Sequence, residues 1–209
     1  MADNKYQTTP DTQIWNDFLN GDKKAFNTIY IDNIQTLYRY GLNFSQDESL
    51  IKDCIHDVFV DLNKYRSNLK STNNIQLYLF KALKNAIIRT LNKNKKQYNI
   101  EKVDVPFYYE ESFEEVLIEN DSELYRINSI REAFSALSAR QKEALYLKFN
   151  SGLDYDEISS ILNINYQSAR NLVHRSIEKL RESYRKSGVL ILFSLLKTFS
   201  ESSHNNQVI

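Results

Sequence analysis

The chain of 209 residues is long enough for one or two domains with a buried core. Its 27 basic and 27 acidic side chains cancel at neutral pH, which argues against a simple polyanion binder. The single cysteine, Cys54, excludes an internal disulfide, and its place on an apolar helix face indicates a core residue. Because Gly (4) and Pro (2) are rare and apolar residues recur at helical spacing, the sequence predicts an all-α fold.

Charge is unevenly distributed along the chain. Residues 13–97 carry 13 basic and 8 acidic side chains, residues 98–132 carry 3 and 10, and residues 133–188 carry 9 and 6. Two basic helical blocks that flank an acidic connector predict two domains. The predicted division is a helical domain at 12–97, an acidic linker at 98–124, a second helical domain at 125–187 and an apolar tail at 188–209.

The first ten residues lack the basic and then apolar pattern of a signal peptide. The only strongly apolar run, Val189–Leu196, is far shorter than the roughly 20 residues that span a bilayer. We therefore expect a cytoplasmic protein. For the apolar tail, packing on its own domain is the first interpretation, and a partner-binding or membrane-surface role is the alternative.

The first two predicted helices are amphipathic. A short helix at 12–20 ends at Gly21, which suits the backbone geometry beyond a helix C-terminus. Asp22 opens a long helix that is expected to break at 41–47. The residues predicted to face inward are Ile14, Trp15, Phe18 and Leu19 in the first helix, and Phe26, Ile29, Tyr30, Ile34, Leu37 and Tyr38 in the second.

A third helix is predicted from about Glu48 to Tyr65. Its outer side is acidic, and an ordinary solvated surface is the first interpretation. A docking face for a protein partner is the alternative, because Val60 adds apolar area among the charges. The predicted core residues are Ile51, Cys54, Ile55, Val58, Phe59 and Leu62, and the outer residues are Asp53, His56, Asp57, Val60 and Asp61.

A polar loop at 67–74 leads into a fourth helix that runs from Ile75 to about Lys96. Cations without an acidic residue line its outer face, a pattern typical of binding to a phosphate backbone, although a solvated lysine face is the alternative. Tyr65 and the asparagines of the loop could stack on or hydrogen-bond an unpaired base. The predicted inward residues are Tyr78, Leu79, Ala82, Leu83, Ala86, Ile87 and Thr90, and the outward ones are Lys81, Lys84, Asn85, Ile88, Arg89, Asn92, Lys93, Lys95 and Lys96.

The second helical block contains a predicted helix-turn-helix. Ser138 and Gln141 form a capping box, and Gly152 ends the helix that this box opens. The following segment, 154–185, reads as two helices joined by a turn at Asn163–Asn165. The second of these helices has a polar and basic outer face that suits the base edges of a major groove, although such a face is often only solvated. Its outward residues are Gln167, Arg170, Asn171, His174, Arg175 and Lys179.

Four segments resemble motifs of the extracytoplasmic-function (ECF) sigma factors of the sigma-70 superfamily, of the Bacteroidetes-like kind. Residues 21–26 (GDKKAF) resemble the family's GDxxAF, and residues 53–59 (DCIHDVF) resemble its D-φ-φ-Q-[DE]-x-F, with His56 where Gln is usual. Residues 78–85 (YLFKALKN) resemble W-L-[FY]-[RK]-x-A-x-N, with Tyr78 in place of Trp. The helix-turn-helix resembles the family's G-x-S-Y-x-E-I-A … V-R-x-φ.

The resemblance implies a promoter-specificity subunit with no cofactor, metal or catalytic residue. Its partners would be core RNA polymerase (the β′ clamp helices and the β flap), promoter DNA and an anti-sigma factor. The implied polymerase-binding residues are Asp53, His56, Asp57, Val60 and Asp61. Those implied for the −10 element are Tyr65, Asn74, Tyr78, Lys81, Lys84, Asn85, Arg89, Lys93 and Lys96. Those implied for the −35 element are Gln167, Ser168, Arg170, Asn171, His174, Arg175 and Lys179.

Two other interpretations stay open at this point. A stand-alone helix-turn-helix regulator would explain the DNA-binding face, but it would leave the segment 53–59 without a purpose. An enzyme is a poor fit, because the three histidines lie far apart in the sequence and no phosphate loop or nucleophile motif is present.

Overall fold

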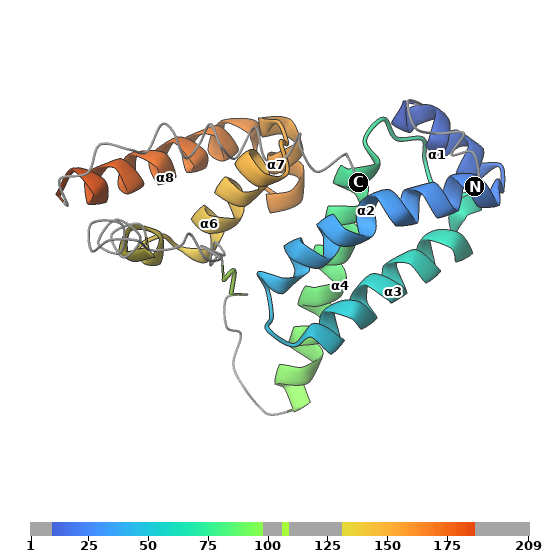
Figure 1. The fold of residues 1–209 in the computed structure, drawn as a ribbon, viewed down its shortest axis with the longest axis horizontal. Helices are drawn as coiled ribbons and strands as arrows, with labels where there is room; N and C mark the ends of the chain where they lie inside the picture. Colours follow the sequence, from blue (N-terminus) through green and yellow to red (C-terminus); the bar gives the residue numbers. More distant parts are fainter. Residues whose placement is uncertain (1–9, 98–105, 109–130, 187–209) are drawn as a thin grey trace, which may run out of the picture. The chain divides into compact units, whose positions relative to one another are not determined.

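The computed structural model describes residues 10–97, 106–108 and 131–186 (Figure 1). The regular secondary structure of these residues is entirely helical, which confirms the predicted all-α fold. The chain divides into two compact units, Met1–Pro106 and Phe107–Ile209, and each is treated by itself. Most of the predicted linker and the apolar tail lie outside the described residues.

The first unit is a helical bundle. Helices α2, α3 and α4 pack pairwise against one another, and α1 packs on α2 (Figure 1). Aromatic side chains fill its interior, where the rings of Trp15 and Phe18 lie 5.4 Å apart and those of Tyr40 and Phe80 lie 4.5 Å apart. The elements are α1 (Asp11–Leu19), α2 (Lys23–Leu42), α3 (Glu48–Lys64), the short 3₁₀ turn η1 (Arg66–Asn68) and α4 (Ile75–Gln97).

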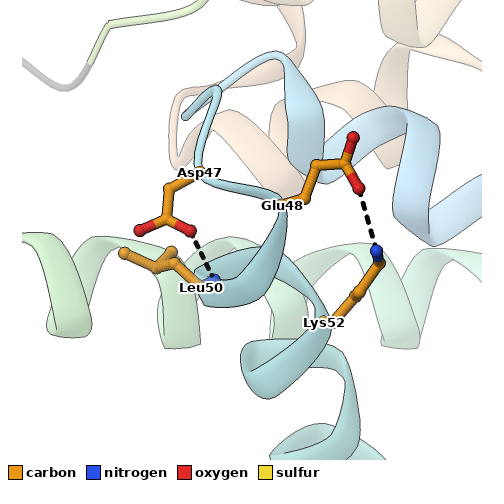
Figure 2. Close-up of polar contacts among 4 residues, drawn as sticks. All are labelled: Asp47, Glu48, Leu50 and Lys52. Atoms are coloured by element: carbon orange, nitrogen blue, oxygen red, sulfur yellow. Dashed lines mark hydrogen bonds and ion pairs between the residues drawn. The ribbon is translucent and has the colours of Figure 1, made fainter.

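Side-chain and glycine caps define the helix ends of the first unit. Beyond α1, Gly21 has a φ of +92°, and the Asp22 amide donates to the Asp17 carbonyl, as in a Schellman motif. Figure 2 shows the start of α3, where Asp47 Oδ1 accepts from the Leu50 amide at 3.1 Å. In the next turn, Glu48 pairs with Lys52 at 2.8 Å (Figure 2). These short-range bonds explain why the predicted helix starts were correct.

The predicted inward stripe of α3 is confirmed in full, since all six of its residues are buried. The prediction for α2 was partly wrong. Ile29 and Leu37 are buried, but Phe26, Ile34 and Tyr38 are only half-buried and Tyr30 is 41% exposed. The reason is that apolar residues occupy more than one face of α2, and the packing of α1, α3 and α4 selects the face that carries Ala25, Ile29 and Tyr40.

The predicted break at 41–47 was also too early, because α2 continues through Gly41 to Leu42. Gly41 serves packing here and not a turn. A Cβ at this position would lie 2.6 Å from Ile51 Cγ2, so only glycine allows α2 and α3 to approach this closely. The chain leaves the helix at Asn43 instead.

The second unit contains the helix-turn-helix. Residues 131–135 are helical, and α6 (Ala139–Leu145) runs into the π-helical turn η2 (Tyr146–Asn150). Helices α7 (Tyr155–Leu162) and α8 (Tyr166–Lys186) follow, and α8 packs against both α6 and α7. The predicted capping box of Ser138 with Gln141 is present, and Asp154 forms another with Glu157 at the start of α7.

One residue of the predicted linker belongs to the core of the second unit. Phe107 is only 3% exposed, and its ring meets Tyr146 edge-on at 5.8 Å between centroids. Burial of an aromatic ring is strongly favourable, so this contact attaches the chain near residue 107 to the second unit. The local acidic composition concealed this position, although the aromatic run Phe107-Tyr108-Tyr109 was a visible signal.

Candidate nucleic-acid and protein interfaces

The outer side of α3 is exposed in the part of the chain that the structure describes. Its five predicted partner-binding residues, Asp53, His56, Asp57, Val60 and Asp61, are all exposed, and Val60 retains 46% of its accessible surface. The side therefore combines three carboxylates with exposed apolar area, as a protein-docking face does.

An open groove of about 800 Å³ lies beside this face, between α2 and α3. His56 and Val60 line it from α3, and Tyr30, Ile34 and Tyr38 line it from α2. The α2 side of the groove was not predicted, because the helical spacing placed these three residues in the core. The excess of apolar residues around α2 was the signal that could have identified them.

A cluster of three polar side chains lies beside this groove. Lys52 and Tyr38, which both line the groove, interact with Glu48. Hydrogen bonds from Lys52 and then Tyr38 lower the pKa of Glu48, and the bond to Glu48 raises the pKa of Tyr38. The Lys52 ammonium also lies 5.5 Å from the centroid of the Tyr38 ring. The cluster thus places a paired carboxylate and ammonium beside the groove.

The residues predicted for the −10 element fall into two groups. Tyr65, Lys81, Asn85, Arg89 and Lys93 are exposed and form a basic surface along α4 and the preceding turn. Asn74, Tyr78 and Lys84 are half-buried, and the side chain of Lys96 lies outside the described residues.

Two members of the half-buried group have structural partners. Asn74 Oδ1 accepts from the Leu77 amide at 2.7 Å and so caps α4. The Tyr78 ring lies 5.1 Å from Trp15, and burial, followed by the charge of Asp61, raises the pKa of the Tyr78 hydroxyl. The structure thus brings together the cations of α4, while it engages Asn74 and Tyr78 in holding the helix start.

On α8, the seven residues predicted for the −35 element are all exposed. Gln167 Nε2 donates to Asn171 Oδ1 at 3.1 Å, and His174 lies 3.4 Å from Glu178. Lys179 differs from the others, because its ammonium donates to the Ala136 carbonyl of the same unit. This bond gives Lys179 a structural role, because it joins α8 to the end of the helical segment at residues 131–135.

Long side chains outside α8 hold the helix-turn-helix together. Arg140 Nη2 donates to the Leu162 carbonyl at 2.8 Å, and Lys148 Nζ donates to the Leu153 carbonyl at 3.0 Å. Lys148 also lies 4.8 Å from the centroid of the Tyr155 ring. These supporting bonds were not predicted from the sequence. Neither was the exposure of Tyr166, which is 46% exposed at the first residue of α8.

Within the described residues, no group of three His, Cys, Asp or Glu side chains is arranged to hold a metal ion. Among the described helices, none is long and apolar enough to cross a membrane. Cys54 is buried, and its thiol donates to Thr90 Oγ1 at 3.7 Å. Burial raises the pKa of this thiol, in agreement with the predicted core position.

The fold and these faces define a class of protein. Over the described residues it is an all-α protein with a helix-turn-helix in one unit, and with a basic exposed face on α4 and an acidic exposed face on α3 in the other. Residues 127–180 match the family described as Sigma-70, region 4.

Relatives with known roles point to the same family. The chain is 22% identical over 163 residues to the ECF RNA polymerase sigma factor SigM of Bacillus subtilis (strain 168), covering 76% of this chain and 94% of that protein. It is 25% identical to SigW of the same organism, an ECF RNA polymerase sigma factor, over 79% of this chain and 91% of that one. The RNA polymerase sigma factor SigZ, also from B. subtilis, is 26% identical over 71% of this chain and 80% of its own length.

Two solved structures share the fold. One is CnrH in complex with the cytosolic domain of CnrY, with a TM-score of 0.56, 14% identity and coverage of 82% of this chain and 95% of that one. The other is the sigma factor RpoE in complex with the anti-sigma factor NepR from Bartonella quintana, with a TM-score of 0.56, 18% identity and coverage of 78% and 98%. The chain is thus similar to ECF sigma factors over most of its length, and its residues 127–180 match region 4 of the sigma-70 family.

Proposed function

We propose that the protein binds core RNA polymerase and directs promoter-specific initiation of transcription by recognising −10 and −35 elements. The sigma-factor role agrees with the relatives and with the region 4 match. In this proposed role the chain catalyses no reaction. Because its partner would be the polymerase, we expect a cytoplasmic location.

The observation that carries the proposal is the exposed outer side of α3 beside the groove. Asp53, Asp57 and Asp61 present carboxylates, and Val60 with the groove residue Tyr30 presents apolar area. Such a mixed surface suits a protein partner, and we assign it to the clamp helices of the polymerase. A stand-alone regulator has no use for this surface, and no observation favours that alternative.

The basic face of α4 is assigned to the −10 element. Lys81, Arg89 and Lys93 are exposed where they can neutralise phosphates, and neutralisation releases bound counterions. Tyr65 is 46% exposed at the end of α3, with the Lys64 ammonium 5.0 Å from its ring centroid. An exposed aromatic ring next to cations suits stacking on an unpaired base.

The outer face of α8 is assigned to the −35 element. Arg170 and Arg175 can donate two hydrogen bonds to guanine, and Gln167 or Asn171 can pair with adenine. All four side chains are exposed on one helix, which the capped turn and Arg140 hold in place. We also propose an anti-sigma factor as a partner, because the RpoE structure contains one.

The test is binding of the purified chain to bacterial core RNA polymerase. We expect tight binding by the natural sequence and loss of binding in Asp53→Ala/Asp57→Ala, because both carboxylates lie on the assigned surface. A matched control, Glu132→Ala/Asp156→Ala, removes the same charge from exposed positions of the other unit and should bind normally. Absence of polymerase binding together with intact DNA binding would favour the stand-alone regulator.

A further inference from the structure

The loop between α3 and α4, residues 65–74, has little regular structure of its own. It contains one 3₁₀ turn, η1, and most of its side chains are exposed. Its described internal side-chain bonds are local, between Thr72 and Asn74. A loop with so few internal contacts needs support from outside to keep one conformation.

Helix α1 supplies that support, from more than 50 residues away. The indole Nε1 of Trp15 donates to the Lys70 carbonyl at 2.9 Å, and Ser71 Oγ donates to Asn16 Oδ1 at 3.3 Å. Asp11 Oδ2 accepts from the Ile75 amide at 2.8 Å, at the first residue of α4. A carboxylate at this position also interacts favourably with the positive end of the helix dipole.

The indole that donates to the loop is itself held in place by the core. The Trp15 side chain is fully buried, with its ring 5.4 Å from Phe18 and 5.1 Å from Tyr78. The turn after α1 also approaches the loop, since a Cβ on Gly21 would lie 3.3 Å from Arg66 Nη2. The core of the first unit thus fixes the position of α1, and α1 fixes the middle and the end of the loop.

We propose that Asp11 and Trp15 are positioning residues for promoter recognition. By holding residues 65–74 and the first turn of α4, they keep the loop in the conformation that accepts an unpaired base. They therefore govern base discrimination at the −10 element without contacting DNA. The proposal rests on the proposed function of the loop and extends it to a helix that the motifs did not assign to DNA.

The test uses the full chain assembled with core RNA polymerase. Single-stranded oligonucleotides randomised over the −10 segment are first selected with the natural sequence. For each protein, the affinity for the best oligonucleotide is then divided by the affinity for each of its single-base variants. This quotient is the discrimination ratio. Trp15→Phe keeps an aromatic ring but removes the donor. We expect it to lower the ratio about three- to tenfold, the effect of one lost hydrogen bond.

A second pair of variants keeps the test independent of the tryptophan. Asp11→Ala removes the acceptor and should lower the ratio by a similar factor, whereas Asp11→Asn keeps an oxygen acceptor and should restore most of it. Gln13→Ala, at an exposed position of the same helix, should leave the ratio unchanged. Binding of core polymerase and of duplex −35 DNA should be unchanged in all four variants.

Three outcomes would overturn the proposal. Unchanged discrimination in Asp11→Ala and in folded Trp15→Phe would show that α1 does not position the loop. An equal loss on every oligonucleotide would indicate reduced stability without a change in loop placement. A natural sequence that itself shows no discrimination would refute the assigned function of the loop, and the first two outcomes would leave that function intact.

Discussion

The two helices with exposed basic faces, α4 and α8, begin in different ways. The start of α8 is held by neighbours in sequence, since Asn165 Oδ1 accepts from the Ser168 amide at 2.7 Å and Asn163 adopts a φ of 51°. The start of α4 has a local cap at Asn74, but it also depends on Asp11, 64 residues away from Ile75. The start of α8 is therefore held by bonds between neighbours in the sequence, whereas the start of α4 also uses a bond from a residue far away in the chain.

The two helices also differ in what they present. The exposed groups of α4 are mainly cations, which attract phosphates regardless of sequence. The exposed groups of α8 include Gln167, Arg170 and Asn171, whose donors and acceptors match base edges. We infer that sequence selectivity of the first unit resides in the loop before α4, and that selectivity of the second unit resides in α8 itself.

The largest expected effect tests whether the two units are independent. Phe80 is fully buried on α4, with its ring 4.5 Å from Tyr40, so Phe80→Ala should destabilise the first unit by about 3–5 kcal/mol. In calorimetry, the transition of the first unit should move to lower temperature while that of the second unit stays in place. Asn92→Ala, at an exposed position of α4, is the control. Equal shifts of both transitions would contradict independent units.

The next effect tests base recognition by α8. Arg170→Ala or Arg175→Ala should weaken binding to −35 DNA by about 1–3 kcal/mol, because each arginine is exposed where it can donate to guanine. Binding isotherms on the selected duplex and on a scrambled duplex provide the measurement. An equal loss on both duplexes would assign these arginines to the phosphates.

The next prediction has a smaller expected effect and tests whether the cations of α4 bind DNA regardless of its sequence. Lys93→Ala or Lys96→Ala should weaken binding to all sequences about equally, by roughly 1 kcal/mol for each lost phosphate contact. The plot of log affinity against log salt concentration should become less steep by about one. Loss confined to one sequence would show that α4 also recognises bases.

The prediction with the smallest expected effect concerns the repulsion between the carboxylates of Asp11 and Asp32. Burial, and then the Asp11 carboxylate, raise the pKa of Asp32 above its ordinary value of 3.8. A raised pKa means that ionisation of Asp32 costs stability as pH rises through the interval between the unfolded and folded pKa values. Asp32→Asn should therefore stabilise the first unit at neutral pH, by less than about 1 kcal/mol because the side chain is exposed.

Denaturant unfolding at neutral pH and well below pH 3.8 measures this difference. The gain should vanish at the lower pH, where Asp32 is protonated in both states. Asp11→Asn should lower the pKa of Asp32 in a carboxylate titration by NMR. A gain that persists at low pH would show that the carboxylate charge is not its cause.

Some features could be predicted because their causes are local. The caps at Asp47, Ser138 and Asp154 each use bonds over three residues, so the sequence alone placed the helix starts. The inward stripe of α3 was predicted in full because most of its apolar residues occupy one face. The exposed residues of α8 follow from the same kind of pattern, so their exposure was predicted correctly, while their role in binding DNA stays a prediction.

Other features were decided by tertiary structure. On α2, apolar residues surround the helix, and only packing against three other helices determines that Tyr40 is buried and Tyr30 lines a groove. Gly41 appeared to be a break because its contact with Ile51 is not visible in the sequence. The bonds from Asp11 and Trp15 to the loop span more than 50 residues. Local periodicity and capping carry no information about such contacts, because these contacts depend on how distant helices meet in the folded unit.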